Sequence, residues 1–106
     1  MKTQLLGKEA KIGLAFLEAV SKGENLSIVE IFQKFENETL IFVPKLMAYA
    51  LRAGGNDITN DEVFDWVDEN GITHPDVMTF ANAFAKSMEV HIPKEEGKPK
   101  ATRAKK

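Results

Sequence analysis

Cysteine is absent from this sequence of 106 residues, which excludes disulfides, thiolate metal sites and thiol nucleophiles together. The absence fits a reducing compartment. No apolar run approaches the roughly 20 residues that a membrane-spanning helix needs. Near the start, the apolar stretch Leu5-Leu6 is too short for the core of a signal peptide. We therefore expect a cytoplasmic protein without a membrane segment.

Groups suited to catalysis or metal binding are also scarce. The two histidines, His74 and His91, belong to no closely spaced metal motif such as HExxH. Oxygen donors alternate from Asp57 onward, but a calcium loop counted from that residue needs glycine where Glu62 stands. No phosphate-binding loop and no nucleophile elbow occurs. The sequence predicts that the protein is not an enzyme and binds no metal or cofactor.

Positive charge is scarce over most of the chain. Residues 1–93 contain 8 Lys and Arg against 14 Asp and Glu, a net charge of −6, whereas residues 94–106 contain 6 against 2, a net charge of +4. An acidic body repels nucleic acid phosphates, which argues against a nucleic-acid reader. Residues 93–106 lack a large apolar side chain that could offset the entropy of ordering them. We expect one domain over residues 1–92 and a disordered basic tail over residues 93–106.

Apolar residues at helical spacing are what the chain has in quantity. Near the end of the domain they recur every three or four positions, which predicts a helix: Val77, Phe80, Ala81, Phe84, Ala85 and Met88. Thr73 or His74 is a candidate cap for this helix, with Pro75 in its first turn.

Two further helices are predicted to begin with capping boxes. In these boxes Ser27 pairs with Glu30, and Thr59 pairs with Glu62. The second of these helices is expected to stop at Gly71. Another helix is predicted over residues 14–20, ending near residues 22–23.

Residues 40–53 are apolar on nearly every side, which is typical of a central, buried helix. Pro44 is expected to kink this helix or to mark its start. Upstream, the residues around Gly7-Lys8 favour a short hairpin with glycine first in the turn, although a helix is the alternative there. The predicted fold class is mainly α, a small bundle of about five helices, with a possible N-terminal β-hairpin.

Aromatic residues exceed what one buried stripe per helix requires. Phe64 and Trp66 are two positions apart and Val67 follows them, so this helix has a broad apolar arc among acids; Phe42 and Tyr49 show a similar excess on residues 40–53. One interpretation is that these helices pack on two sides. The other is a docking face for a protein partner, where aromatics are enriched. We take these five residues as the candidate partner-binding residues.

Three segments together resemble a known family. They are KIGLAFLEAV at residues 11–20, LMAYAL at residues 46–51 and ITNDEVFDWVD at residues 58–68. In order and spacing they resemble the small tail assembly chaperones of long-tailed (siphovirus-type) phages and prophages. The resemblance covers roughly residues 5–90 and contains no catalytic signature.

The resemblance implies a helical, self-associating protein of the host cytoplasm that is absent from the mature virion. Its partners would be the tape measure protein, which it keeps soluble, and the tail tube protein. In such families a longer form made by ribosomal frameshifting recruits the tube protein, and the lysine-rich end of this chain is compatible with a slippery codon run. The alternative is a small helical regulator that dimerises and contacts nucleic acid through residues 93–106.

Overall fold

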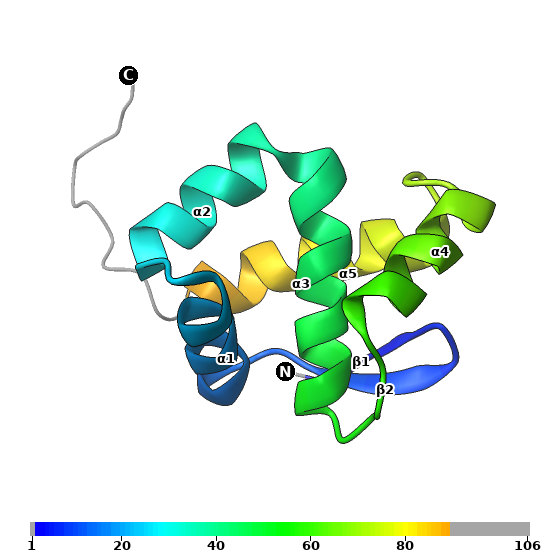
Figure 1. The fold of residues 1–106 in the computed structure, drawn as a ribbon, viewed down its shortest axis with the longest axis horizontal. Coiled ribbons are helices and arrows are strands. Elements are labelled where there is room, and N and C mark those ends of the chain that lie inside the picture. The colour runs from blue at the N-terminus through cyan, green and yellow to red at the C-terminus, as the bar shows by residue number, and fades with distance from the viewer. Residues whose placement is uncertain (1, 90–106) are drawn as a thin grey trace.

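The computed structural model describes residues 2–89, and it confirms the predicted fold class: five helices follow a two-stranded antiparallel hairpin. The predicted disordered tail, residues 93–106, lies outside the described residues. The elements are β1 (Lys2–Leu5), β2 (Lys8–Lys11), α1 (Leu14–Glu24), α2 (Ile28–Asn37), α3 (Thr39–Ala53), α4 (Asn60–Asn70) and α5 (Pro75–Glu89), shown in Figure 1.

The hairpin pairs Leu5 with Lys8, so its loop consists of Leu6 and Gly7. Glycine is therefore second in the turn, and the prediction that it would be first was wrong. Both loop residues have positive φ, 55° and 74°, as in the type I′ turns whose twist matches that of the paired strands. Leu6 donates its N–H to Asp76 Oδ2 over 3.0 Å, which ties the strained turn to the start of α5.

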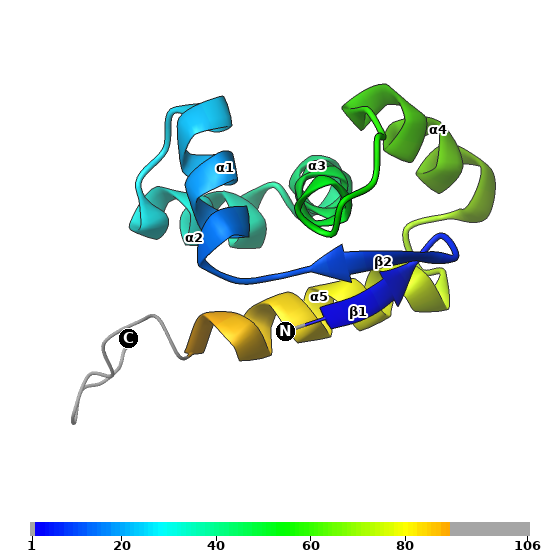
Figure 2. The same cartoon turned by 90° about the horizontal axis from the view of Figure 1, so that it is seen from below.

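Helix α3 lies at the centre of the molecule, seen end-on in Figure 2, and contacts β2 and all four other helices. The sequence predicted this central position. Pro44 does not mark the start of the helix, because α3 begins at Thr39 and runs through it. The proline has no N–H to donate to the carbonyl of Leu40, in the exposed first turn.

Both predicted capping boxes are present. The Ser27 and Thr59 hydroxyls each accept a hydrogen bond from the backbone N–H three residues on, over 3.2 Å. The glutamate carboxylate at that position in turn accepts from the backbone N–H of the serine or threonine, over 2.8 Å. His74 Nδ1 accepts from the N–H of Asp76 over 3.0 Å and so caps α5. Helix α1 ends at Glu24, slightly later than predicted, with Asn25 in the left-handed region.

One end of the core is sealed by aromatic rings from three helices. Phe84 of α5 lies 6.0 Å from the ring of Phe16, 5.6 Å from Phe32 and 4.7 Å from Phe35, between ring centroids. Phe16 and Phe84 are fully buried. These contacts join α1, α2 and α5, and Figure 2 shows α5 passing beneath the other helices.

Candidate protein-binding surface

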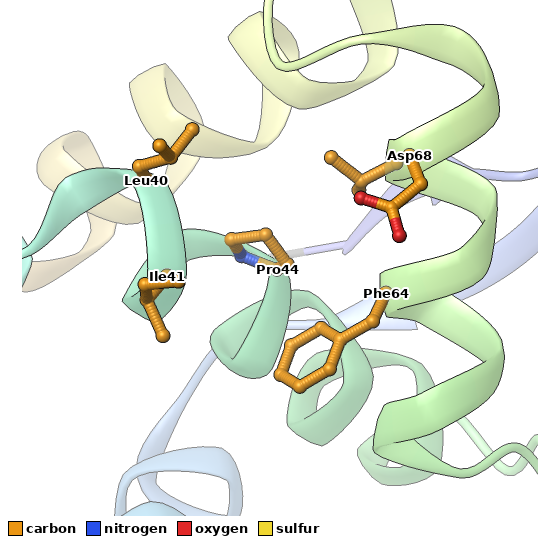
Figure 3. Close-up of a pocket in the computed structure, with 6 residues that line it drawn as sticks. Leu40, Ile41, Pro44, Phe64 and Asp68 are labelled. Carbon is orange, nitrogen blue, oxygen red and sulfur yellow. The ribbon is translucent and has the colours of Figure 1, made fainter.

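A hollow of about 320 Å³ lies between the first turns of α3 and the side of α4 that carries Phe64, Val67 and Asp68. Its lining is apolar except at one edge: Leu40, Ile41, Pro44, Phe64, Val67 and Asp68. Figure 3 shows residues of α3 on one side of the gap, Phe64 and Asp68 on the other, and the phenyl ring pointing from α4 toward α3. The volume is at the lower end of the roughly 300–1,000 Å³ typical of ligand pockets.

The walls of this hollow are unusually exposed for large aliphatic side chains. Leu40 keeps 63% of its surface accessible and Ile41 keeps 61%, although the next residue, Phe42, is 2% exposed. At the start of α3, one side of the helix therefore faces the core, with Phe42, and the other faces solvent, with Leu40 and Ile41. These two aliphatic side chains and the half-buried phenyl ring of Phe64 thus expose apolar surface to the same hollow.

Helix α4 gives the hollow an acidic rim. Its carboxylates are Asp61, Glu62, Asp65, Asp68 and Glu69, and residues 60–70 contain no Lys or Arg. Glu62 accepts from the Thr59 N–H in the capping box. No salt bridge within residues 2–89 involves α4. The apolar floor is thus bordered by negative charge on one side.

The structure separates the aromatic residues of α4. Phe64 and Val67 line the hollow, and Val67 is only 8% exposed, so it contributes to the floor. Trp66 lies two positions from Phe64, about 200° around the helix. Its ring packs edge-on against His74, with 4.7 Å between ring centroids, and contacts the core. Trp66 therefore belongs to a different surface from Phe64.

The two candidates on α3 lie away from the hollow. Phe42 is buried in the core. Tyr49 is half-buried and donates its hydroxyl to Glu24 Oε2 over 2.8 Å, while Lys45 Nζ donates to Glu24 Oε1 over 3.0 Å. The guanidinium carbon of Arg52 lies 4.8 Å from the centre of the tyrosine ring.

This polar cluster shifts two pKa values. Burial, followed by the hydrogen bond and the charge of Glu24, raises the pKa of Tyr49 to about 12. Burial also raises the pKa of Glu24, but the hydrogen bonds from Tyr49 and Lys45 and the nearby positive charges outweigh it, so the pKa of Glu24 is lowered. The arrangement is a tie between α1 and α3, and none of its residues lines the hollow between α3 and α4.

Sequence reasoning did not single out Leu40 and Ile41, although they form one wall of the hollow. They lie within a segment apolar on nearly every side, and nothing local shows that its first turn projects beyond its neighbours.

Among residues 2–89, no cluster of three or more histidines and carboxylates is placed to hold a metal ion. No helix in that part of the chain is long and apolar enough to cross a membrane.

Comparisons with protein-family models, with curated proteins and with solved structures give no match to this chain.

Proposed function

We propose that this protein acts by contact as a tail assembly chaperone of a long-tailed phage or prophage, binding the tape measure protein and keeping it soluble in the host cytoplasm. The observation that carries the proposal is the open apolar hollow between α3 and α4, with Leu40, Ile41 and Phe64 on its walls. Of the segments resembling that family, residues 60–68 of α4 contain the lining residues Phe64, Val67 and Asp68, whereas residues 46–51 of α3 lie outside the lining of the hollow.

The proposed mechanism is the covering of apolar surface. Fully burying an aliphatic side chain is worth about 1.5–3 kcal/mol, so covering two that are largely exposed gives a useful but modest affinity. The partner would be an amphipathic helix, whose apolar face fits a groove between helices. Weak contacts repeated along a long tape measure can be released one after another.

In this proposal the chaperone self-associates on the tape measure and tail tube subunits displace it, so that it is absent from the finished particle. A frameshifted longer form of the chain would recruit the tube protein. The gene tests this last element directly: the proposal of a longer form requires a slippery heptamer and an overlapping open frame, and it fails without them.

Co-expression with a tape measure fragment tests the function. Replacing Ile41 by serine places a hydroxyl in the hollow and is expected to lower the soluble yield of the fragment and to weaken binding about tenfold. Leu14→Ser is the matched control, because Leu14 is 69% exposed on α1 and lies outside the hollow. Unchanged binding by a folded Ile41→Ser protein would exclude the hollow as the contact surface.

A second variant separates the competing function. Shortening the chain after Pro93 removes the basic residues and is expected to leave tape measure binding largely intact. Nucleic-acid binding that this truncation abolishes, together with no affinity for tail proteins, would instead identify a regulator that uses residues 93–106.

A further inference from the structure

Three of the five acidic residues of α4 form a stripe on the side of the helix that includes Asp68, a lining residue of the hollow. Asp61, Asp65 and Asp68 follow the i, i+4, i+7 spacing that puts them on one face of the helix. Asp68 also lines the hollow, one turn after Phe64. All three side chains are exposed. Asp68 therefore borders the hollow, and Asp61 and Asp65 continue from it along the same face of α4.

This stripe differs from four acidic residues elsewhere in residues 2–89, which are paired with lysines. Glu9, Glu18, Glu24 and Glu38 each form a salt bridge with a lysine, at 3.6, 3.2, 3.0 and 3.0 Å. No such pair reaches α4. Like charges at i, i+4 repel one another, so the spacing of Asp61 and Asp65 is unfavourable for the isolated helix.

Asp61 lies in the first turn of α4, where the helix dipole favours a carboxylate, but the acidic residues at the other end of the helix are placed unfavourably. Asp68 and Glu69 lie in the last turn, where the negative end of the helix dipole disfavours carboxylates, and that turn contains no basic residue. The helix thus keeps an uncompensated negative stripe beside an open apolar floor. A binding partner that supplies positive charge along that edge would compensate it.

From this geometry we infer that the segment occupying the hollow is an amphipathic helix that carries Lys or Arg beside its apolar stripe, on the side facing α4. The inference rests on the proposed function and adds the chemistry of the partner. Apolar side chains fill the space between α3 and Phe64, and the basic side chains reach Asp61, Asp65 and Asp68. The charges speed encounter and fix orientation, while the apolar contact holds the helix in place.

Two other occupants fit less well. A second copy of this chain, packed groove to groove, would bring two acidic stripes together, and like charges across an interface are unfavourable. Residues 94–106 of the chain itself carry positive charge, but they contain no large apolar side chain to fill the floor. The occupant must provide both properties in one segment.

Designed helical peptides test the inference on the full-length protein. Three labelled peptides share one leucine stripe and differ only at the flanking positions, which hold Lys, Gln or Glu. Fluorescence anisotropy titrations are expected to give the order Lys, Gln, Glu, with about tenfold between the first two, as expected for a few exposed ion pairs. Raising the salt from about 50 to about 500 mM should weaken only the Lys peptide appreciably, because it screens exposed charges.

Three variants locate the effect. The triple change Asp61→Asn, Asp65→Asn and Asp68→Asn is expected to remove the preference for Lys without unfolding α4, since it relieves repulsion. The triple control Glu9→Gln, Glu18→Gln and Glu36→Gln removes the same charge from other elements and should keep the preference. Ile41→Ser should weaken all three peptides.

The outcomes separate this inference from the proposed function. Equal binding of the three peptides, lost in Ile41→Ser, would overturn the basic partner while supporting the apolar contact. Binding of the Lys peptide that survives Ile41→Ser would show attraction without docking and would overturn the inference. If no peptide binds, the hollow is not a helix-docking site and both fail.

Discussion

The two ends of the helical body use the same kinds of residue in opposite ways. At the end formed by α1, α2 and α5, the rings of Phe16, Phe32, Phe35, Phe80 and Phe84 converge and close the core. At the end formed by α3 and α4, Leu40, Ile41 and Phe64 surround an open hollow. Figure 1 shows α4 and the pair α1 and α2 on opposite sides of α3.

The difference is one of coverage. Helix α5 runs beneath the molecule, and its Phe84 contacts rings of α1 and α2. At the aromatic end, Phe16 and Phe84 are therefore fully buried. At the other end, Leu40 and Ile41 remain largely exposed beside the hollow. We therefore expect stability to depend mainly on the aromatic end and partner binding on the hollow, and the following predictions test that division.

The largest expected effect is that of Phe84→Ala. Removing a buried ring that contacts four others leaves a cavity, and such changes cost about 3–5 kcal/mol of unfolding free energy. Urea denaturation followed by circular dichroism measures the loss. Phe64→Ala is the paired control, with an expected loss below about 1.5 kcal/mol because the ring is already half-exposed. Equal losses in the two variants would contradict the division.

Sequence alone predicted the helices well because their signals are local. The capping boxes at Ser27 and Thr59 and the heptad-like run from Val77 to Phe84 each act within one turn or one face. The turn of the hairpin was misplaced by one residue because Leu6 adopts positive φ, which its side chain disfavours. In that conformation the N–H of Leu6 donates to Asp76, 70 positions away, a contact that no local pattern contains.

Gly54→Ala has the next largest expected effect, because it tests how firmly the hairpin joins α3. A Cβ at this position would collide with the backbone carbonyl oxygen of Glu9, and backbone cannot rotate away. Such overpacking costs about 1–3 kcal/mol. Thermal unfolding measures it, with Gly13→Ala as control, since that Cβ meets nothing within 4 Å. A neutral Gly54→Ala would mean that the hairpin can shift on α3.

Tyr49→Phe probes the polar tie on the other side of α3. Losing the hydroxyl bond to Glu24 is expected to cost about 1 kcal/mol near neutral pH. Because the folded-state pKa of Tyr49 is raised from 10.0 to about 12, the tyrosine contributes fully below pH 10.0 and progressively less as the pH rises toward 12. The stability gap between wild type and variant should therefore narrow in alkali.

Urea unfolding at pH about 8 and about 11.5 measures that gap, and using the difference between the two proteins cancels the titration of lysines. A gap that stays constant would show that neither burial nor the bond to Glu24 raises the pKa of Tyr49 in the folded protein. Because the pKa of Glu24 is lowered, the same tie should weaken in acid, as the pH falls below the ordinary value of 4.5.

The candidate surface was harder to predict than the fold. The sequence showed an excess of aromatic residues on α4. It did not show that Trp66 packs against His74 while Phe64 lines the hollow, because the two residues are close neighbours of similar character on one helix. It also could not separate exposed Ile41 from buried Phe42. Which side of an all-apolar helix is left open depends on how its neighbours end, a property of the whole assembly.

The smallest expected change in stability is that of Ile41→Ala, and it bears most directly on the comparison of the two ends. Ile41 is largely exposed, and alanine has the higher helix propensity, so the unfolding free energy should change by no more than about 0.5 kcal/mol. Ile31→Ala is the matched variant: Ile31 is fully buried on α2, and the same truncation there should cost about 2–5 kcal/mol. Urea denaturation of both proteins measures the contrast. A large loss of unfolding free energy for Ile41→Ala would mean that this side chain supports the fold. If the loss is small, the apolar surface of Ile41 is not needed for folding and is available to a partner.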